Sequence, residues 1–85
     1  MDTYQPAKSP INGVVLFDIA LKHLSGNNVG ATDVDFLRNS DAIAEIRFML
    51  KASGWKHDEN YVRQVMRIMY HKVKAHQFLI ELESS

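Results

Sequence analysis

The sequence predicts an all-α fold, a small bundle of three main helices plus one short helix, with a long C-terminal helix. Three observations predict it. Apolar residues recur at helical spacing in three stretches. Glycine-containing segments at 26–31 and at Gly54 separate these stretches. The 85 residues, 46% of them hydrophobic and none of them cysteine, can form one core that must stabilise the fold without disulfides.

The N-terminal residues divide into a polar lead and the start of the first helix. Residues 1–8 contain Pro6 and mostly polar side chains, which predicts a flexible N-terminal segment before a single helical domain at 9–85. Ser9 can accept hydrogen bonds from the free amides of a first turn, and Pro10 suits the first helical position, where a backbone N–H has no partner. We therefore expect the first helix to begin here.

The first helix is apolar around most of its surface. Asp18 and Lys22, four residues apart, form a narrow polar strip, which predicts burial on several sides and a place at the centre of the bundle. Gly26 can adopt the left-handed conformation at no steric cost, so we expect the helix to end there. The apolar residues are Val14, Leu16, Phe17, Ile19, Ala20, Leu21 and Leu24.

The middle of the chain begins with the predicted internal loop, 26–31, which holds two glycines and two asparagines. Thr32 and Asp35 follow with the spacing of a capping box, which predicts a short helix. After it the chain either breaks near Asn39 or continues as one helix to Ser53. We expect the break.

The second main helix has one apolar face. Gly54 should end this helix. Trp55 then occupies the position where a Schellman motif packs an apolar side chain against the residue five earlier, here Leu50, so we interpret Trp55 as structural rather than as a platform for a ligand. The apolar face consists of Ala42, Ile43, Ile46, Met49 and Leu50.

The last helix is predicted to be the longest element. Asp58 and Glu59 favour a helix start, and no glycine or proline occurs before Ser84. A wide apolar face predicts that this helix spans the core. That face consists of Tyr61, Val62, Val65, Met66, Ile68, Met69, Val73, Leu79 and Ile80.

Formal net charge is zero, but the charges are unevenly distributed. Residues 1–46 contain six acids and three bases, whereas residues 47–80 contain two acids and seven bases. On a helical wheel, bases of the last helix fall within about 40° of one another, opposite the apolar face. We call this surface the basic stripe, and it consists of Arg63, Arg67 and Lys74 with Tyr70 and His71 on its flanks.

The basic stripe has three interpretations. Cations one turn apart can neutralise successive nucleic-acid phosphates while Tyr70 stacks on a base. The stripe can also be a solvated face, or it can bind an acidic protein partner or the acidic N-terminal half of a second copy. A helix-turn-helix fits poorly, because residues 54–57 precede the cap of an unusually long last helix.

The sequence contains no catalytic constellation. It lacks a phosphate loop ending in Lys-Ser/Thr, a Gly-x-Ser-x-Gly elbow and a His-Glu-x-x-His pair. His71 and His76 are the closest histidines, and a spacing of five points their rings apart on a helix. Capping and the helix dipole explain His57, Asp58 and Glu59. We expect no enzyme activity, no metal and no cofactor.

Three residues near the C-terminus break the pattern of the last helix. Lys72 and His76 project toward its apolar side, whereas Phe78 projects toward the basic stripe. In one interpretation the last turns leave the core and expose an apolar patch to a partner. In the other the last turn is bent, and Lys72 lies along the edge of the core. The candidate patch consists of Phe78, Leu79 and Leu82.

These observations lead to two functional hypotheses. The first is a non-catalytic helical interaction protein, an adaptor or inhibitor of a protein partner that can also form a homo-oligomer through its C-terminal helix. The alternative is a nucleic-acid-binding regulator that uses the basic stripe. No run of residues reaches the roughly 18 apolar residues of a membrane span, so we expect a cytoplasmic protein without a membrane partner.

Overall fold

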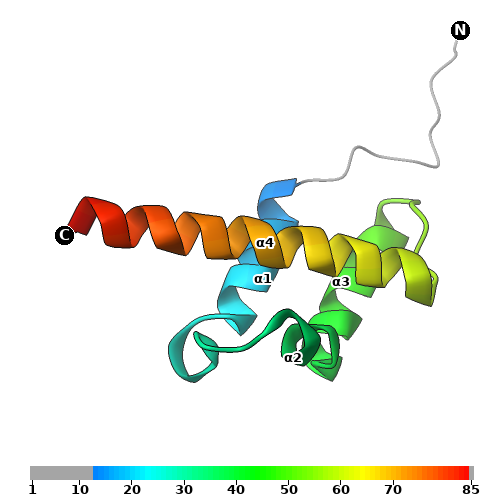
Figure 1. Ribbon diagram of the computed structural model, residues 1–85. Coiled ribbons are helices and arrows are strands. Elements are labelled where there is room, and N and C mark those ends of the chain that lie inside the picture. The colour runs from blue at the N-terminus through cyan, green and yellow to red at the C-terminus, as the bar shows by residue number, and fades with distance from the viewer. Residues whose placement is uncertain (1–12, 85) are drawn as a thin grey trace, which may run out of the picture.

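The computed structural model describes residues 13–84, which fold into helices joined by short loops (Figure 1). In chain order these are α1 (Gly13–His23), the 3-10 helix η1 (Gly26–Asn28), α2 (Asp33–Leu37), α3 (Ser40–Ala52) and α4 (Glu59–Ser84). No strand occurs within residues 13–84, and the predicted all-α fold with a long C-terminal helix is confirmed. The predicted flexible segment 1–8 and the predicted helix start at Ser9 and Pro10 lie outside the described residues.

α4 lies across the other helices and joins them. It packs against α1, α2 and α3, while α1 also packs against α3. In Figure 1 the N-terminal half of α4 crosses α3, its middle crosses α1, and its C-terminal end extends past the rest of the bundle. The centre of the fold is therefore α4 rather than the first helix. α1 nevertheless buries most of its apolar surface: Leu16, Ala20 and, directly after the helix, Leu24 are in the core, and Phe17, Ile19 and Leu21 are partly buried against it. Val14 is the exception, at 69% exposed.

A single core fills the space between the four α-helices. The predicted apolar face of α3 supplies part of it, and in α4 the last buried residue is Val73. Ile68, Leu79 and Ile80 were expected on the core face of this helix, but they are about half exposed because no other described element covers them. The buried core consists of Leu16, Ala20, Leu24, Phe36, Ala42, Ile46, Leu50, Val62, Met66 and Val73.

Two glycines end helices as the sequence predicts. Gly26 has φ of 64° and Gly54 has φ of 77°, both in the left-handed region that favours glycine. After Gly54 the Trp55 N–H donates to the Leu50 carbonyl oxygen at 2.9 Å, which is the outer hydrogen bond of a Schellman motif. The Trp55 side chain packs against the core, which confirms its structural interpretation.

The predicted capping box and the predicted break are both present. The Asp35 N–H donates to Thr32 Oγ1 at 3.2 Å, and the Thr32 N–H donates to Asp35 Oδ2 at 3.1 Å. Hydrogen bonding by the Thr32 N–H, and less strongly by the Thr32 hydroxyl, holds the pKa of the Asp35 carboxyl below its ordinary value. At the break, Asn39 Oδ1 accepts a hydrogen bond from the Ala42 N–H at 3.1 Å and caps α3.

A polar contact joins α1 to α3 at the surface. Lys22 Nζ donates to Glu45 Oε1 at 2.8 Å, and His23 Nε2 lies 3.2 Å from Glu45 Oε2. The Lys22 hydrogen bond holds the pKa of Glu45 below its ordinary value, with a smaller contribution from His23. Lys22, predicted only as part of a polar strip, therefore ties two helices together.

Candidate interaction surfaces on α4

The residues of the basic stripe differ in their contacts. Tyr70 and Lys74 bond to the loop before α2, whereas Arg63, Arg67 and His71 are exposed. Tyr70 Oη donates to the Ala31 carbonyl oxygen at 3.1 Å, and Lys74 Nζ donates to the Val29 carbonyl oxygen at 2.6 Å. Lys74 Nζ also lies 5.5 Å from the centre of the Tyr70 ring, a cation–π distance. These two side chains therefore fasten the loop before α2 onto α4, and they do not extend freely into solvent as the helical wheel suggests.

Tyr70 also contacts aromatic rings on both sides. Its ring centre lies 6.3 Å from that of Phe36 in the core, and the exposed His71 ring stands edge-on to it at 5.4 Å. Stacking of Tyr70 on a nucleic-acid base would require these contacts to break. Of the five predicted residues, Arg63, Arg67 and His71 remain exposed.

The exposed arginines of α4 lie beside a third arginine from α2. Val34, Leu37, Arg38, Arg63 and Arg67 together line a hollow of about 290 Å³ between α2 and α4. Arg63 also pairs with Glu59 one turn earlier, at 2.8 Å. Arg38 was not predicted here, because nothing in the local sequence indicates that the end of α2 packs beside α4.

The side of α4 that faces α1 carries the two residues that break its apolar pattern. The His76 ring stands edge-on to Phe17, with centres 5.5 Å apart. Lys72 lines a hollow of about 430 Å³ together with Val14, Phe17 and Met69. Lys72 and His76 thus lie beside α1, on the apolar side that the sequence assigned to them.

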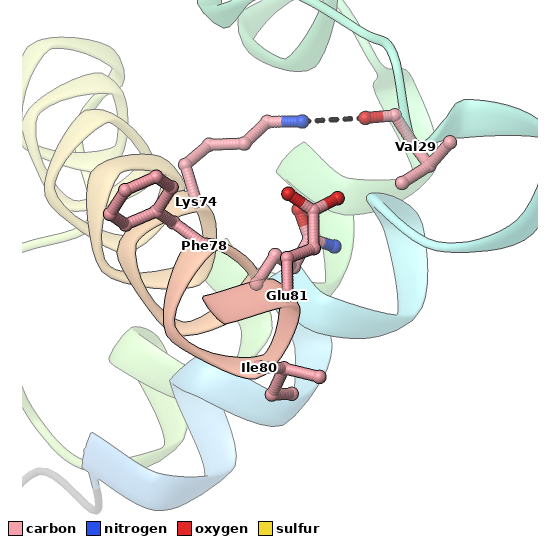
Figure 2. Close-up of a pocket in the computed structure, with 6 residues that line it drawn as sticks. Val29, Lys74, Phe78, Ile80 and Glu81 are labelled. Carbon is pink, nitrogen blue, oxygen red and sulfur yellow. Dashed lines mark hydrogen bonds between the residues drawn. The ribbon is translucent and has the colours of Figure 1, made fainter. Parts of the chain in front are cut away.

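The last turns of α4 carry large apolar side chains that face in several directions. Gln77 Nε2 donates to the Leu24 carbonyl oxygen at 3.3 Å, and Lys74 reaches Val29 (Figure 2). Figure 2 also shows Phe78 and Ile80 on different sides of the helix. Phe78, Leu79 and Leu82 are 59%, 55% and 55% exposed, and Ile80 and Ile68 are 48% and 53% exposed.

The histidines and acids of the described residues do not form a metal-binding cluster. No group of three or more His, Cys, Asp or Glu side chains could hold a metal ion within residues 13–84. His57 Nδ1 lies 3.1 Å from the Trp55 carbonyl oxygen, Asp58 Oδ2 accepts from the Tyr61 N–H, and Glu59 pairs with Arg63. Asp58 therefore caps α4, in agreement with the capping interpretation, whereas His57 contacts the preceding loop and Glu59 pairs along the helix.

The length of the link between α3 and α4 tests whether these helices form a helix-turn-helix motif. Residues 53–58 separate the two helices, and α4 has 26 residues. A helix-turn-helix has a tight turn of about three to four residues before a recognition helix. The longer link and the long second helix disagree with that motif.

Comparison of the chain with protein families, curated proteins and solved structures found no match. Among the described helices, none combines the length and the apolar character needed to cross a membrane.

Proposed function

We propose that this chain is a non-catalytic interaction protein that binds protein through the exposed apolar side chains of α4. The observation that carries the proposal is the cluster of half-exposed Phe78, Leu79 and Leu82 beyond Val73, the last core residue of the helix. Exposed apolar clusters of this kind mark protein docking sites, and an amphipathic helix commonly docks by laying its apolar side in a groove. The same surface serves an adaptor or an inhibitor, because either acts by occupying its partner.

The division of the basic stripe supports this choice over nucleic-acid binding. Tyr70 and Lys74 are engaged with the loop at 29–31, so phosphate contacts along α4 lose two of their five predicted residues. Within residues 13–84, no hydrogen bond or ring contact holds the side chains of Phe78, Leu79 and Leu82 against the bundle. Phe78, Leu79 and Leu82 stay more than half exposed.

The test is affinity capture with two baits that differ only on this surface. The wild-type chain and a Leu79→Glu/Leu82→Glu variant are each immobilised and offered cell extract together with a second, differently tagged copy of the chain. The proposal expects specific capture by the wild type and its loss with the variant. Lys51→Ala/Lys56→Ala, at exposed positions outside α4, is the matched control and should capture as the wild type does. Equal capture by all three baits would contradict the proposal.

A second candidate function rests on the arginine hollow. Arg38, Arg63 and Arg67 all line one hollow of about 290 Å³. Guanidinium groups bind phosphate with paired, charge-assisted hydrogen bonds. This arrangement favours a local phosphate contact within a nucleic-acid-binding regulator.

Fluorescence anisotropy of labelled duplex and single-stranded oligonucleotides over a salt series tests this alternative. Nucleic-acid binding predicts a log–log salt slope of about −2 to −3 that shrinks in Arg63→Ala/Arg67→Ala. It also predicts no effect of Leu79→Glu/Leu82→Glu. If the oligonucleotides do not bind at low salt, the alternative is eliminated.

A further inference from the structure

α4 carries a second apolar pattern, distinct from the face that enters the core. Seven residues follow one another at alternating spacings of four and three, the heptad spacing of helices that pair side by side. At 3.6 residues per turn, their centre lies about 130° around the helix from the core residues Val62, Met66 and Val73. We call this row the α4 seam, and it consists of Tyr61, Val65, Ile68, Lys72, Ala75, Leu79 and Leu82.

Most of the α4 seam is open to solvent. Tyr61 and Val65 are partly buried against their own core, but every seam residue from Ile68 to Leu82 is exposed. Lys72 also lines the hollow formed with Val14, Phe17 and Met69, so the seam meets this hollow at Lys72.

From this geometry we infer that α4 pairs antiparallel with α4 of a second copy through the α4 seam. This inference rests on the proposed function and names the partner of the same surface. The seam residues occupy two alternating heptad positions. In an antiparallel pair, a residue at one of these positions faces a residue at the other position of the second helix. Val65 then meets Leu82 of the second copy, Ile68 meets its Leu79, and Lys72 meets its Ala75. The α4 seam can therefore pack against a second α4 seam that runs in the opposite direction.

Lys72 decides between the two orientations. A parallel pair places Lys72 against Lys72 of the second copy, which sets two like charges inside the contact. The antiparallel pair places Lys72 against a small alanine, so its aliphatic stem can lie over Ala75 of the second copy while the ammonium reaches water. The seam contains one Lys and one Ala, at the two positions that the antiparallel register brings together.

The charge gradient along α4 favours the same orientation. One acid, Glu59, and four bases, Arg63, Arg67, Lys72 and Lys74, precede residue 75 in α4, whereas the only charged residues of the helix after it are Glu81 and Glu83. A parallel pair aligns bases with bases and acids with acids. The antiparallel pair brings the acidic end of each helix to the basic half of the other, which lowers the electrostatic energy. The paired segment 65–82 would be about 27 Å long, at 1.5 Å per residue.

Cysteine cross-linking tests the orientation directly, since the chain has no cysteine of its own. Ile68→Cys and Leu79→Cys are prepared as separate full-length variants, and each is oxidised alone and in an equal mixture. Both positions are exposed, so the fold is kept, and circular dichroism checks this. Lys51→Cys on the exposed surface of α3 is the control for random collision.

The antiparallel pair predicts a disulfide between Ile68→Cys and Leu79→Cys in the mixture. It also predicts that neither variant forms a disulfide with a second copy of itself. The two Ile68 Cα atoms would stand about 16 Å apart along the axis, from 1.5 Å per residue. A disulfide needs Cα atoms about 4.4–6.8 Å apart. Light scattering of the wild-type chain should give the mass of a dimer. The Leu79→Glu/Leu82→Glu variant should have the mass of a monomer.

Two outcomes overturn the inference. Self-linked Ile68→Cys as the main product would show a parallel pair. A monomeric wild type with no mixed disulfide would show that α4 does not pair with itself. If that monomer still captures another protein through Leu79 and Leu82, the proposed function survives while the self-pairing fails. If capture is also independent of these leucines, both fail.

Discussion

The contacts of Tyr70, a residue of the predicted basic stripe, give it a structural role. Its hydroxyl donates to the Ala31 carbonyl oxygen, and its ring contacts Phe36 on the core side and Lys74 on the solvent side. A residue placed on the flank of a basic stripe by the helical wheel is therefore a structural bridge. This bridge and Lys74 hold the loop at 29–31 to α4. The arginines of the basic stripe that stay exposed to a ligand are therefore Arg63 and Arg67.

Tyr70→Phe tests this role. The variant keeps the ring and loses the hydrogen bond to Ala31, so it should lower the free energy of unfolding by about 1 kcal/mol. Urea denaturation followed by circular dichroism measures the change. Tyr61→Phe is the control, since the Tyr61 hydroxyl makes no hydrogen bond within residues 13–84, and it should stay close to the wild type. An equal effect of the two substitutions would contradict the bridging role.

Glu45 gives the fold a pH dependence of known sign. Lys22, and less strongly His23, hold its pKa below the ordinary value of 4.5 in the folded chain. A carboxyl with a depressed pKa stabilises the fold above its unfolded pKa, and this contribution is lost as the pH falls through the folded pKa.

The stability of the wild type should therefore fall below about pH 4.5, and Glu45→Gln should remove part of that fall. Urea midpoints measured at a series of pH values check this expectation. Asp18→Asn, at an exposed position of α1, is the control and should keep the acid dependence of the wild type. A Glu45→Gln profile that follows the wild type throughout would show that the α1–α3 contact adds no stability.

At the scale of elements, local capping decides where the helices begin and end. Asn39 caps α3 and so separates it from α2, which lets the short helix turn Phe36 into the core. Ser40, the next residue, already lies inside α3, so the capping side chain is that of Asn39.

Asn39→Ala and Ser40→Ala form a matched pair. Loss of the Asn39 cap should lower the free energy of unfolding by about 1 kcal/mol, because the Ala42 N–H loses its acceptor. Ser40 already lies inside the helix, so Ser40→Ala should change the stability by less than about 0.5 kcal/mol. Denaturant titration of both variants measures this. A larger loss in Ser40→Ala would place the cap at Ser40.

The last turns of α4 should be dispensable for folding. The core ends at Val73 and the contact with Leu24 uses Gln77. Removal of 78–85 should therefore leave a cooperatively folded domain, with the free energy of unfolding changed by less than about 1 kcal/mol. Circular dichroism and thermal unfolding measure both properties. Collapse of the truncated chain would show that the exposed turns stabilise the fold rather than bind a partner.

At the scale of the whole molecule, the sequence predicts local features well and long-range ones poorly. The capping box at Thr32 and the Schellman motif at Trp55 depend on residues within five positions, so spacing alone indicates them. Contacts of Tyr70 with Ala31 and of Lys74 with Val29 span 39 and 45 positions. A helical wheel treats a helix as isolated, so it could neither show these contacts nor bring Arg38 beside α4.

The whole molecule is a short bundle with one helix longer than the body requires. Its extents are 53 × 27 × 16 Å, and the longest dimension includes the end of α4 that passes beyond α1 (Figure 1). Beyond Val73, Lys74, His76 and Gln77 still contact the body of the bundle, whereas residues 78–84 extend past it. The proposed association would give these last residues a role, since it uses their exposed apolar side chains.

Sedimentation equilibrium of the full chain over a wide range of concentrations tests association through α4 most directly. The wild type should pass from monomer to dimer as its concentration rises. Leu79→Glu/Leu82→Glu should remain monomeric throughout, and Lys51→Ala, on the exposed surface of α3, should associate as the wild type does. A wild type that stays monomeric, or a dimer that the leucine substitutions leave intact, would contradict self-association through the apolar side chains of α4.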